Sequence, residues 1–443
     1  MKTLLLHVAE KLRASAWTIP TALAIAAFLL AQGLLHLDHF FTDETHYWIG
    51  WIEISSPEGA RTLLATIATS MLAIAGVSFS SIMVTMALAS QQFGPRLLRN
   101  FIKDKFSQTV LGMHLATFLY CLFILRGVRT TGNFPFVPQL STLAALILGI
   151  LCLGLFIRFV HHIITEIQVE CVAADAYQSL KKSLDSLFPE VGAEEQEYRV
   201  ENNDPGGWQI IAGKTGYVQA INLKKLVEIA SKYDAVLVTE TKAGNFVSDG
   251  KAIIRVVDGP TPDEAEASMI DDLQRAFLTG SVRNAEQDVE YGMRQLVEVA
   301  VRALSPGIND PFTAMNCIDY LGAGLQLAFA RPLPPSIYRD NKGNIRLFSW
   351  TNSHRDLVET ALNQIRQASR DRCDVSCRLL EMLTETARVS EREDQQLALM
   401  EQAQLINLNT LPTLFNDHDC DAIRSRFAHF TKTCHLIDPF QNA

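Results

Sequence analysis

The sequence contains no motif of a recognisable reaction. No Cys-x-x-Cys pair, glycine-rich phosphate loop, paired-carboxylate motif or nucleophile–base arrangement occurs among its 443 residues. Charge is also scarce, because Asp, Glu, Lys and Arg make up 20% of the chain, against about 25% in an average soluble protein. These absences argue against a soluble enzyme, a disulfide scaffold and a disordered chain. We therefore expect no catalytic residue, no cofactor and no metal site.

The charge that is present is unevenly distributed. Residues 1–170 hold 11 Lys and Arg against 9 Asp and Glu, whereas the remaining 273 residues hold 28 against 39. A mean hydropathy of +0.11 is therefore an average over two unlike parts, one apolar and one acidic. The acidity of the C-terminal part argues against nucleic acid as a partner, because phosphate binding needs clustered Lys and Arg.

Four long apolar runs predict four transmembrane helices. They cover about residues 15–37, 63–90, 107–125 and 136–162. Each is close to or above the ~20 helical residues that cross a hydrocarbon core of ~30 Å. No charged side chain lies within the apolar centre of any run. A coupled transporter usually needs such a group, so passive conduction or simple anchoring is favoured.

Basic residues predict the orientation of these spans. Three cations precede the first span, and four fill the link between the second and third spans: Arg96, Arg99, Lys103 and Lys105. Since positive charge is enriched on the cytoplasmic side, we expect both termini and the acidic C-terminal region to be cytoplasmic. The four cations could also attract anions at the inner mouth of a pore, but the anchoring interpretation is favoured.

The second span carries an unusual stripe of small and hydroxyl residues. The stripe consists of Thr66, Ser70, Ala73, Val77, Ser81, Thr85 and Ala89. Small residues allow close helix packing, and hydroxyl groups bond across helices or to a carbonyl one turn back. Alternatively, hydroxyl groups line a narrow wet path in an oligomer. Helix packing and pore lining are compatible if this helix lies at a central axis. The pore-lining candidates are then Thr66, Ser70, Ser81 and Thr85.

The C-terminal part predicts an α+β region built from unlike segments. A helical extension and linker occupy residues 171–207, a small β-rich module 208–260, and a helical domain 261–443. The fold class is therefore a polytopic α-helical membrane protein with four transmembrane helices and a C-terminal α+β cytoplasmic region.

Residues 303–314 are the most distinctive stretch of this region. Two prolines and a glycine predict a tight turn between helices, with Asn309 or Asp310 capping the second helix and Pro311 in its first turn. The exposed N-terminus of that helix could instead bind an anion. Ser305, Asn309 and Asp310 are therefore candidates for either a ligand site or a structural loop, and the structural interpretation is favoured.

Residue types that bind metals gather near the C-terminus without a standard zinc spacing. They lie in the stretch Asp417-His418-Asp419-Cys420-Asp421. This pattern favours a solvated, capped helix start. Cys373 and Cys377 are one helical turn apart, which is more often chance than a site.

Two segments carry a family resemblance. One runs from Ser78 to Phe101 and contains Ser90-Gln91-Gln92-Phe93-Gly94-Pro95-Arg96, and the other runs from Glu286 to Ala314. Together they resemble a bacterial family of predicted membrane proteins, domain of unknown function 2254, over most of residues 10–410. The resemblance implies four N-terminal spans and a soluble C-terminal region. We expect the chain to lie in the inner (plasma) membrane of a bacterium. It implies no activity, ligand or catalytic residue.

These observations predict two alternative functions. The first is a homo-oligomeric channel or pore with residues 62–90 near the axis and a cytoplasmic regulatory domain. The alternative is a membrane-anchored sensor or scaffold whose cytoplasmic domain binds a small ligand or a protein partner. The expected partners are the lipid bilayer, further copies of the chain, and a small ion or ligand.

Overall fold

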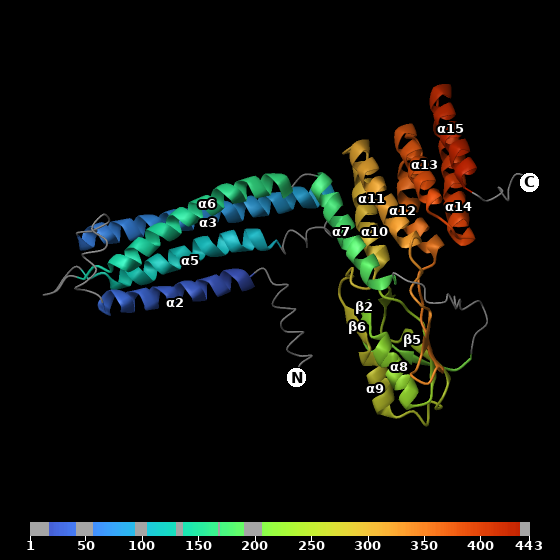
Figure 1. The fold of residues 1–443 in the computed structure, drawn as a ribbon, viewed down its shortest axis with the longest axis horizontal. Coiled ribbons are helices and arrows are strands. Elements are labelled where there is room, and N and C mark those ends of the chain that lie inside the picture. The colour runs from blue at the N-terminus through green and yellow to red at the C-terminus, as the bar shows by residue number, and fades with distance from the viewer. Residues whose placement is uncertain are drawn as a thin grey trace, which may run out of the picture. The chain divides into compact units, whose positions relative to one another are not determined.

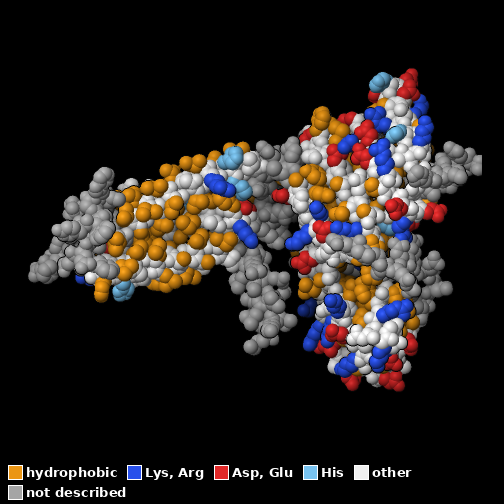
Figure 2. Space-filling model, in the orientation of Figure 1, with side chains coloured by type: hydrophobic (Ala, Val, Ile, Leu, Met, Phe, Trp, Pro, Cys, Tyr) orange, Lys and Arg blue, Asp and Glu red, His pale blue; other side chains and the backbone are white. Residues whose placement is uncertain are grey.

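The computed structural model describes residues 17–40, 56–93, 104–129, 136–166, 169–189 and 206–434. The chain divides into two compact units, Met1–Gln168 and Val169–Ala443. Figure 2 shows apolar side chains covering the visible face of the first unit, whereas charged side chains gather on the second.

The first unit is a bundle of four helices (Figure 1). They are α2 (Thr18–Phe40), α3 (Pro57–Phe93), α5 (Lys105–Gly127) and α6 (Gln139–Glu166). Each is long and apolar enough to cross a membrane, which confirms the four predicted spans. The first helix continues to Phe40, beyond the predicted end near residue 37. It therefore includes the acidic Asp38, one residue beyond that predicted end.

Helix α5 is the centre of this bundle, because it packs against α2, α3 and α6. Its buried face contains Ala116, Tyr120 and Ile124, which join Leu64 and Ala68 of α3. A Cβ at Gly112 would collide with Pro20 of α2, and one at Gly127 would collide with Leu35. These two glycines therefore allow α2 to approach α5 closely, as small residues do between membrane helices.

The second unit begins with α7 (Val169–Leu187) and then forms a β-rich module. The strands are β1 (Trp208–Ile211), β2 (Gly216–Ile221), β3 (Val236–Thr239), β4 (Phe246–Val247), β5 (Ala252–Asp258), β6 (Phe277–Gly280), β7 (Ile337–Arg339) and β8 (Ile345–Phe348). One sheet has the order β1-β5-β3-β8-β7 and the other the order β4-β2-β6. Strands β3 and β8 are parallel, and the other pairs are antiparallel. Helices α8 (Leu223–Lys232) and α9 (Ala267–Arg275) belong to the same module and share its apolar core.

The module extends beyond the predicted boundary at residue 260. Strand β6 completes the smaller sheet, and β7 and β8 add to the larger sheet after two intervening helices. The expectation that residues 261–443 are purely helical is therefore wrong for these three strands. They have three or four residues each, which is too few for alternation of apolar and polar residues to reveal them.

The remaining helices form the second part of this unit. They are α10 (Val289–Ala303), α11 (Pro311–Phe329), α12 (His354–Ala368), α13 (Cys373–Arg388), α14 (Glu393–Thr410) and α15 (Asp417–Thr433), with a short 3₁₀ turn, η2 (Leu411–Thr413). Helices α7, α10 and α11 pack together, and α13 contacts α11, α14 and α15. Asp288, Asp310 and Ser353 cap α10, α11 and α12 through their side chains.

Candidate functional site

The exposed surface of α3 carries a stripe of small and hydroxyl side chains, which the exposed Met83 and Val84 interrupt between Ser80 and Ala87. The stripe follows the helix at positions Thr62, Thr66, Thr69, Ala73, Gly76, Ser80 and Ala87, all exposed. Larger exposed side chains, such as Leu72 and Phe79, flank it. On α6, by contrast, exposed positions such as Ile150 and Ile157 are large and apolar, as lipid contact requires. We refer to these seven residues of α3 as the small-residue face.

Gly76 lies on this face without a packing reason inside the chain. A Cβ at Gly76 would meet no described atom within 4 Å, unlike a Cβ at Gly112 or Gly127. Glycine inside a helix is less favourable than alanine by about 1 kcal/mol. A close approach from outside the four-helix unit would explain why this position has no side chain.

Two threonines of the small-residue face bond to their own helix. Thr66 Oγ1 donates to the carbonyl of Thr62 at 2.7 Å, and Thr69 Oγ1 donates to the carbonyl of Ala65 at 2.9 Å. These bonds leave the lone pairs of the two hydroxyl oxygens free. Both threonines can therefore contact another helix or water without burying an unpaired proton.

The predicted pore-lining residues do not share one side of α3. Thr66 and Ser70 are exposed, Ser81 is half-buried, and Thr85 is buried against the rest of the bundle. The stripe predicted from the sequence steps mostly by four residues. At 100° per residue, it therefore drifts around the helix by about 140° between Thr66 and Ala89. The structure therefore brings Thr66 and Ser70 to the exposed side and turns Thr85 inward.

Of the four basic residues predicted at the inner mouth of a pore, the structure describes Lys105 alone. Arg96, Arg99 and Lys103 lie outside the described residues. Lys105 is exposed at the start of α5, directly after Asp104, which caps this helix and pairs with His162 of α6 at 3.0 Å. The α5 start and the end of α6 therefore lie together.

Asp38 connects α2 to the start of α6. Its carboxylate accepts hydrogen bonds from the amides of Leu140 and Ser141 at 2.9 and 3.0 Å, and from Ser141 Oγ at 2.5 Å. Tyr120 of α5 donates to the carbonyl of Ser141 at 2.9 Å. Asp38 is 5% exposed, so this acidic group is buried and fully engaged in capping a neighbouring helix.

The loop between α10 and α11 uses its polar side chains for structure. Asp310 caps α11 by accepting from the amide of Thr313 at 3.1 Å, and Ser305 Oγ donates to the carbonyl of Arg302 at 2.6 Å. Asn309 has a left-handed backbone, with φ of 53°, and its side-chain oxygen accepts from Arg372 of the loop before α13. The cap and the Pro311 start agree with the structural interpretation, while ligand binding at this loop stays a prediction.

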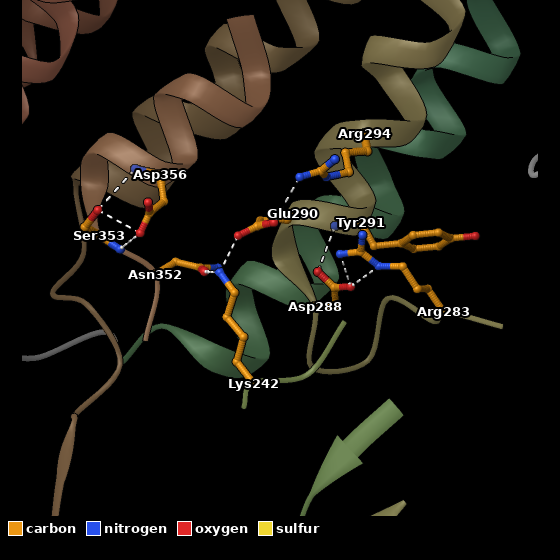
Figure 3. Close-up of polar contacts among 9 residues, drawn as sticks. All are labelled: Lys242, Arg283, Asp288, Glu290, Tyr291, Arg294, Asn352, Ser353 and Asp356. Atoms are coloured by element: carbon orange, nitrogen blue, oxygen red, sulfur yellow. Dashed lines mark hydrogen bonds and ion pairs between the residues drawn. The ribbon is translucent and has the colours of Figure 1, made fainter. Parts of the chain in front are cut away.

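A charged seam joins the β-rich module to the helices (Figure 3). Lys242, in the turn after β3, donates to Glu290 Oε1 at 2.5 Å and to the side-chain oxygen of Asn352. The other oxygen of Glu290 lies 3.4 Å from Arg294, one turn along α10. Glu290 is 8% exposed, so its charge is compensated by these two cations rather than by water.

A second ion pair lies beside the first at the start of α10. Arg283 approaches Asp288 Oδ2 at 2.6 Å, while Asp288 Oδ1 accepts from the amide of Tyr291 at 3.0 Å. Burial raises the pKa of Asp288, against the opposing effect of Arg283. A Cβ at Gly244 would collide with both Asp288 and Arg283, so a glycine with φ of 91° is required there.

Sequence reasoning did not find the seam, which we define by Lys242, Arg283, Asp288, Glu290 and Asn352. The segment starting at Glu286 is part of the family resemblance, and that was the available signal for Asp288 and Glu290. Lys242 and Asn352 come from distant turns that no local pattern connects. Its carboxylates and cations neutralise each other, so the seam is a polar contact between two parts of the unit.

Comparisons with known proteins agree with this architecture. A family model described as "Predicted membrane protein (DUF2254)" matches residues 13–385. The chain is similar to an uncharacterised protein of Mycobacterium tuberculosis strain H37Rv, with 28% identity over 359 residues that cover 79% of this chain and 68% of the relative. An uncharacterised protein of Mycobacterium bovis matches with the same identity and coverage. No solved structure matches the chain.

Proposed function

The chain belongs to the family of predicted membrane proteins catalogued as domain of unknown function 2254, and on that premise we propose that it is a homo-oligomeric channel or pore. In this proposal α3 lies near the symmetry axis, and the C-terminal unit regulates conduction. The membrane is the bacterial inner membrane, with both termini on the cytoplasmic side.

The small-residue face of α3 is the observation that carries the proposal. Lipid chains gain little contact from Gly and Ala, and they offer no donor to the lone pairs that the threonine hydroxyl oxygens leave free. A second copy of the chain, or water along an axis, suits this face better. In this proposal the closest approach of a second copy lies at Gly76, which has open space around it within the chain.

Passive conduction is favoured over coupled transport by the state of Asp38. An intramembrane carboxylate is usually a candidate for ion or proton coupling. Here both carboxylate oxygens accept hydrogen bonds from Leu140 and Ser141, which gives Asp38 a structural role at the start of α6.

The proposed orientation rests on the positive-inside pattern of the sequence. Cations precede α2 and fill the link between α3 and α5, and Lys105 and Arg158 are exposed at the corresponding ends of α5 and α6. Cysteine accessibility to an impermeant reagent in intact cells would test the side on which each link lies.

Conductance of the purified chain in planar bilayers tests the channel directly. We expect unitary currents from the wild type and their loss in Gly76→Leu, because a bulky side chain would block close approach at the axis. Gly154→Leu is the matched control. Gly154 is also exposed on a membrane helix, α6, and is also open within 4 Å, so this substitution should leave the currents intact.

Two results would overturn the channel proposal. One is a correctly inserted wild type that shows no current under any voltage. The other is a monomeric mass for the detergent-solubilised wild type together with unchanged unitary currents in Gly76→Leu.

The charged seam favours a second candidate, a membrane-anchored sensor or scaffold. Its ion pairs join a β-rich module to a helical part, and polar interfaces of this kind allow relative motion when a ligand or partner binds. Native mass spectrometry of the purified chain would test this candidate. A stoichiometric retained molecule, together with silence in the bilayer, would favour it over the channel.

A further inference from the structure

Two thiols lie together at the start of α13. Cys373 is the first residue of this helix and Cys377 follows one turn later, with the two sulfur atoms 3.8 Å apart. The start of α15 packs against this point, because Cys373 Sγ lies 3.6 Å from the carbonyl oxygen of Asp419. Figure 1 shows α13 and α15 side by side. The fold therefore brings together two cysteines and a segment whose contact residue, Asp419, lies 46 residues after Cys373.

The helical geometry disfavours a disulfide between these cysteines. Residues four apart on a helix have Cβ atoms about 5–6 Å apart, whereas a disulfide holds its Cβ atoms about 3.5–4.5 Å apart. Closing the bond would require the first turn of α13 to unwind. Both thiols are free in the structure.

The same spacing fits a metal ion held between the two sulfur atoms. Metal–sulfur bonds of about 2.3 Å place two sulfur atoms about 3.8 Å apart at a tetrahedral angle and about 4.0 Å apart at the 120° angle of a three-coordinate ion. The observed separation therefore needs no rearrangement of the helix. The carbonyl of Asp419 lies at a distance from Cys373 that an oxygen ligand of the same ion would have.

The number of donors selects an ion of low coordination number. Within the described ranges, no three His, Cys, Asp or Glu side chains are arranged to hold a metal. Structural zinc takes four protein ligands, so two thiolates and a carbonyl do not meet its needs. Thiolate ligands and few donors suit copper(I), a soft ion with a filled d shell.

The charges around the thiols act in both directions on a copper(I) complex. Two thiolates and one monovalent cation carry a net charge of −1, which is favoured at the N-terminus of a helix. Burial raises the pKa of both thiols, to about 12 for Cys377, and so do the carboxylates of Asp374 and Asp419 at Cys373 and of Glu381 at Cys377. Arg426 lowers the pKa of both thiols. Arg426 is held at 2.7 Å from Glu381 of α13, so its guanidinium is fixed near the pair.

We propose that Cys373 and Cys377 form a binding site for a monovalent thiophilic metal ion of the copper(I) class. Each thiol loses its proton on binding, so one copper(I) ion is bound and two protons are released to solvent. No electron is transferred in this step. The site is independent of α3 and of the proposed channel.

Anaerobic titration of the full chain in detergent with copper(I) tests the site, using a colorimetric copper(I) chelator as competitor. We expect the wild type to remove one equivalent from the chelator and Cys373→Ser to lose this ability. Cys373 is partly exposed and begins its helix, so this variant retains the fold even if the buried Cys377→Ser does not.

Cys420→Ser is the matched control, because Cys420 is also partly exposed and follows Asp419 directly. It should bind one equivalent as the wild type does. The proposal is overturned if the wild type competes no better than Cys373→Ser, or if Cys420→Ser loses binding to the same extent. X-ray absorption of the loaded wild type should show two sulfur ligands at the copper.

Discussion

Lys242 Nζ lies 2.5 Å from Glu290 Oε1, which ties a turn of the β-rich module to the first turn of α10. The side chains of Lys242 and Glu290 are 20% and 11% exposed, so water screens this pair only weakly. Asn352, ahead of α12, accepts a further hydrogen bond from the same ammonium group. Three segments that are distant in sequence therefore meet at one cation.

Removing Glu290 should cost more stability than removing Lys242. In Glu290→Gln, both Lys242 and Arg294 lose their carboxylate, whereas in Lys242→Met the carboxylate keeps Arg294 at 3.4 Å. We expect Glu290→Gln to lower the free energy of unfolding by about 2–3 kcal/mol, since partly buried charges are left unpaired. Denaturant unfolding of the full chain in detergent would measure the difference.

An exposed ion pair provides the control for this comparison. Lys225 and Glu228 lie 3.5 Å apart on α8 with side chains 48% and 69% exposed. Glu228→Gln should change the stability by less than about 0.5 kcal/mol. Equal losses in Glu228→Gln and Glu290→Gln would contradict a special role for the seam.

Gly244→Ala should destabilise the unit more than Gly250→Ala. Both glycines have left-handed backbones, with φ of 91° and 86°, so both substitutions carry a backbone cost of about 1 kcal/mol. Only at Gly244 would the added Cβ collide with Asp288 and Arg283, while Gly250 has nothing within 4 Å. We expect Gly244→Ala to lower the free energy of unfolding by about 2–4 kcal/mol.

Thermal unfolding of these two variants separates backbone strain from steric collision. If Gly244→Ala and Gly250→Ala unfold at the same temperature, the close approach of Gly244 to Asp288 does not affect the stability of the unit. A larger shift for Gly244→Ala supports the seam as a tightly packed contact.

Local composition was sufficient to predict the four membrane helices. A span needs only about 20 apolar residues in sequence, so its existence depends on no distant contact. Its ends were less well predicted, because Asp38 lies within α2 although a carboxylate usually marks the end of a span. The amides at the start of α6 stabilise Asp38, and no property of residues 15–40 reveals them.

Long-range pairing limited the prediction of the C-terminal unit. A cap at Asn309 or Asp310 was predicted because a cap and its helix are adjacent in sequence, and Asp310 is the residue that caps α11. The parallel pairing of β3 with β8 joins Leu237 to Leu347, and the seam joins Lys242 to Glu290. Such pairs arise from the packing of whole elements, so the periodicity of one segment does not contain them.

Asp38→Ala should loosen the start of α6. The substitution removes the acceptor for the amides of Leu140 and Ser141, which would then be buried without a partner. We expect a local loss of about 1 kcal/mol or more, seen as faster hydrogen exchange at these two amides in lipid nanodiscs. Asp38→Asn keeps one acceptor oxygen, so its exchange rates at these amides should lie between those of the wild type and Asp38→Ala.

The start of α5 serves as an internal control in the same measurement. Asp104 caps its own helix through the amides of Phe106 and Ser107, independently of Asp38. Exchange there should be unchanged in Asp38→Ala. Uniformly faster exchange at both helix starts would indicate general unfolding of the bundle and contradict a local cap.

Asp340 should make the β7–β8 hairpin sensitive to acid. The hydrogen bond from Arg346, together with amides of Asn344 and Lys342, lowers the pKa of Asp340 from 3.8 to about 2. A carboxyl whose pKa is lower in the folded state stabilises the fold above its unfolded pKa, and this contribution is lost as the pH falls toward the folded pKa. The wild type should therefore be more stable than Asp340→Asn at pH 6, with the difference shrinking between about pH 4 and pH 2 as Asp340 becomes protonated.

Denaturant unfolding of both proteins across this range, followed by tryptophan fluorescence, measures the difference in stability. A difference that stays constant down to pH 2 would show that Asp340 has the same pKa in the folded and unfolded states.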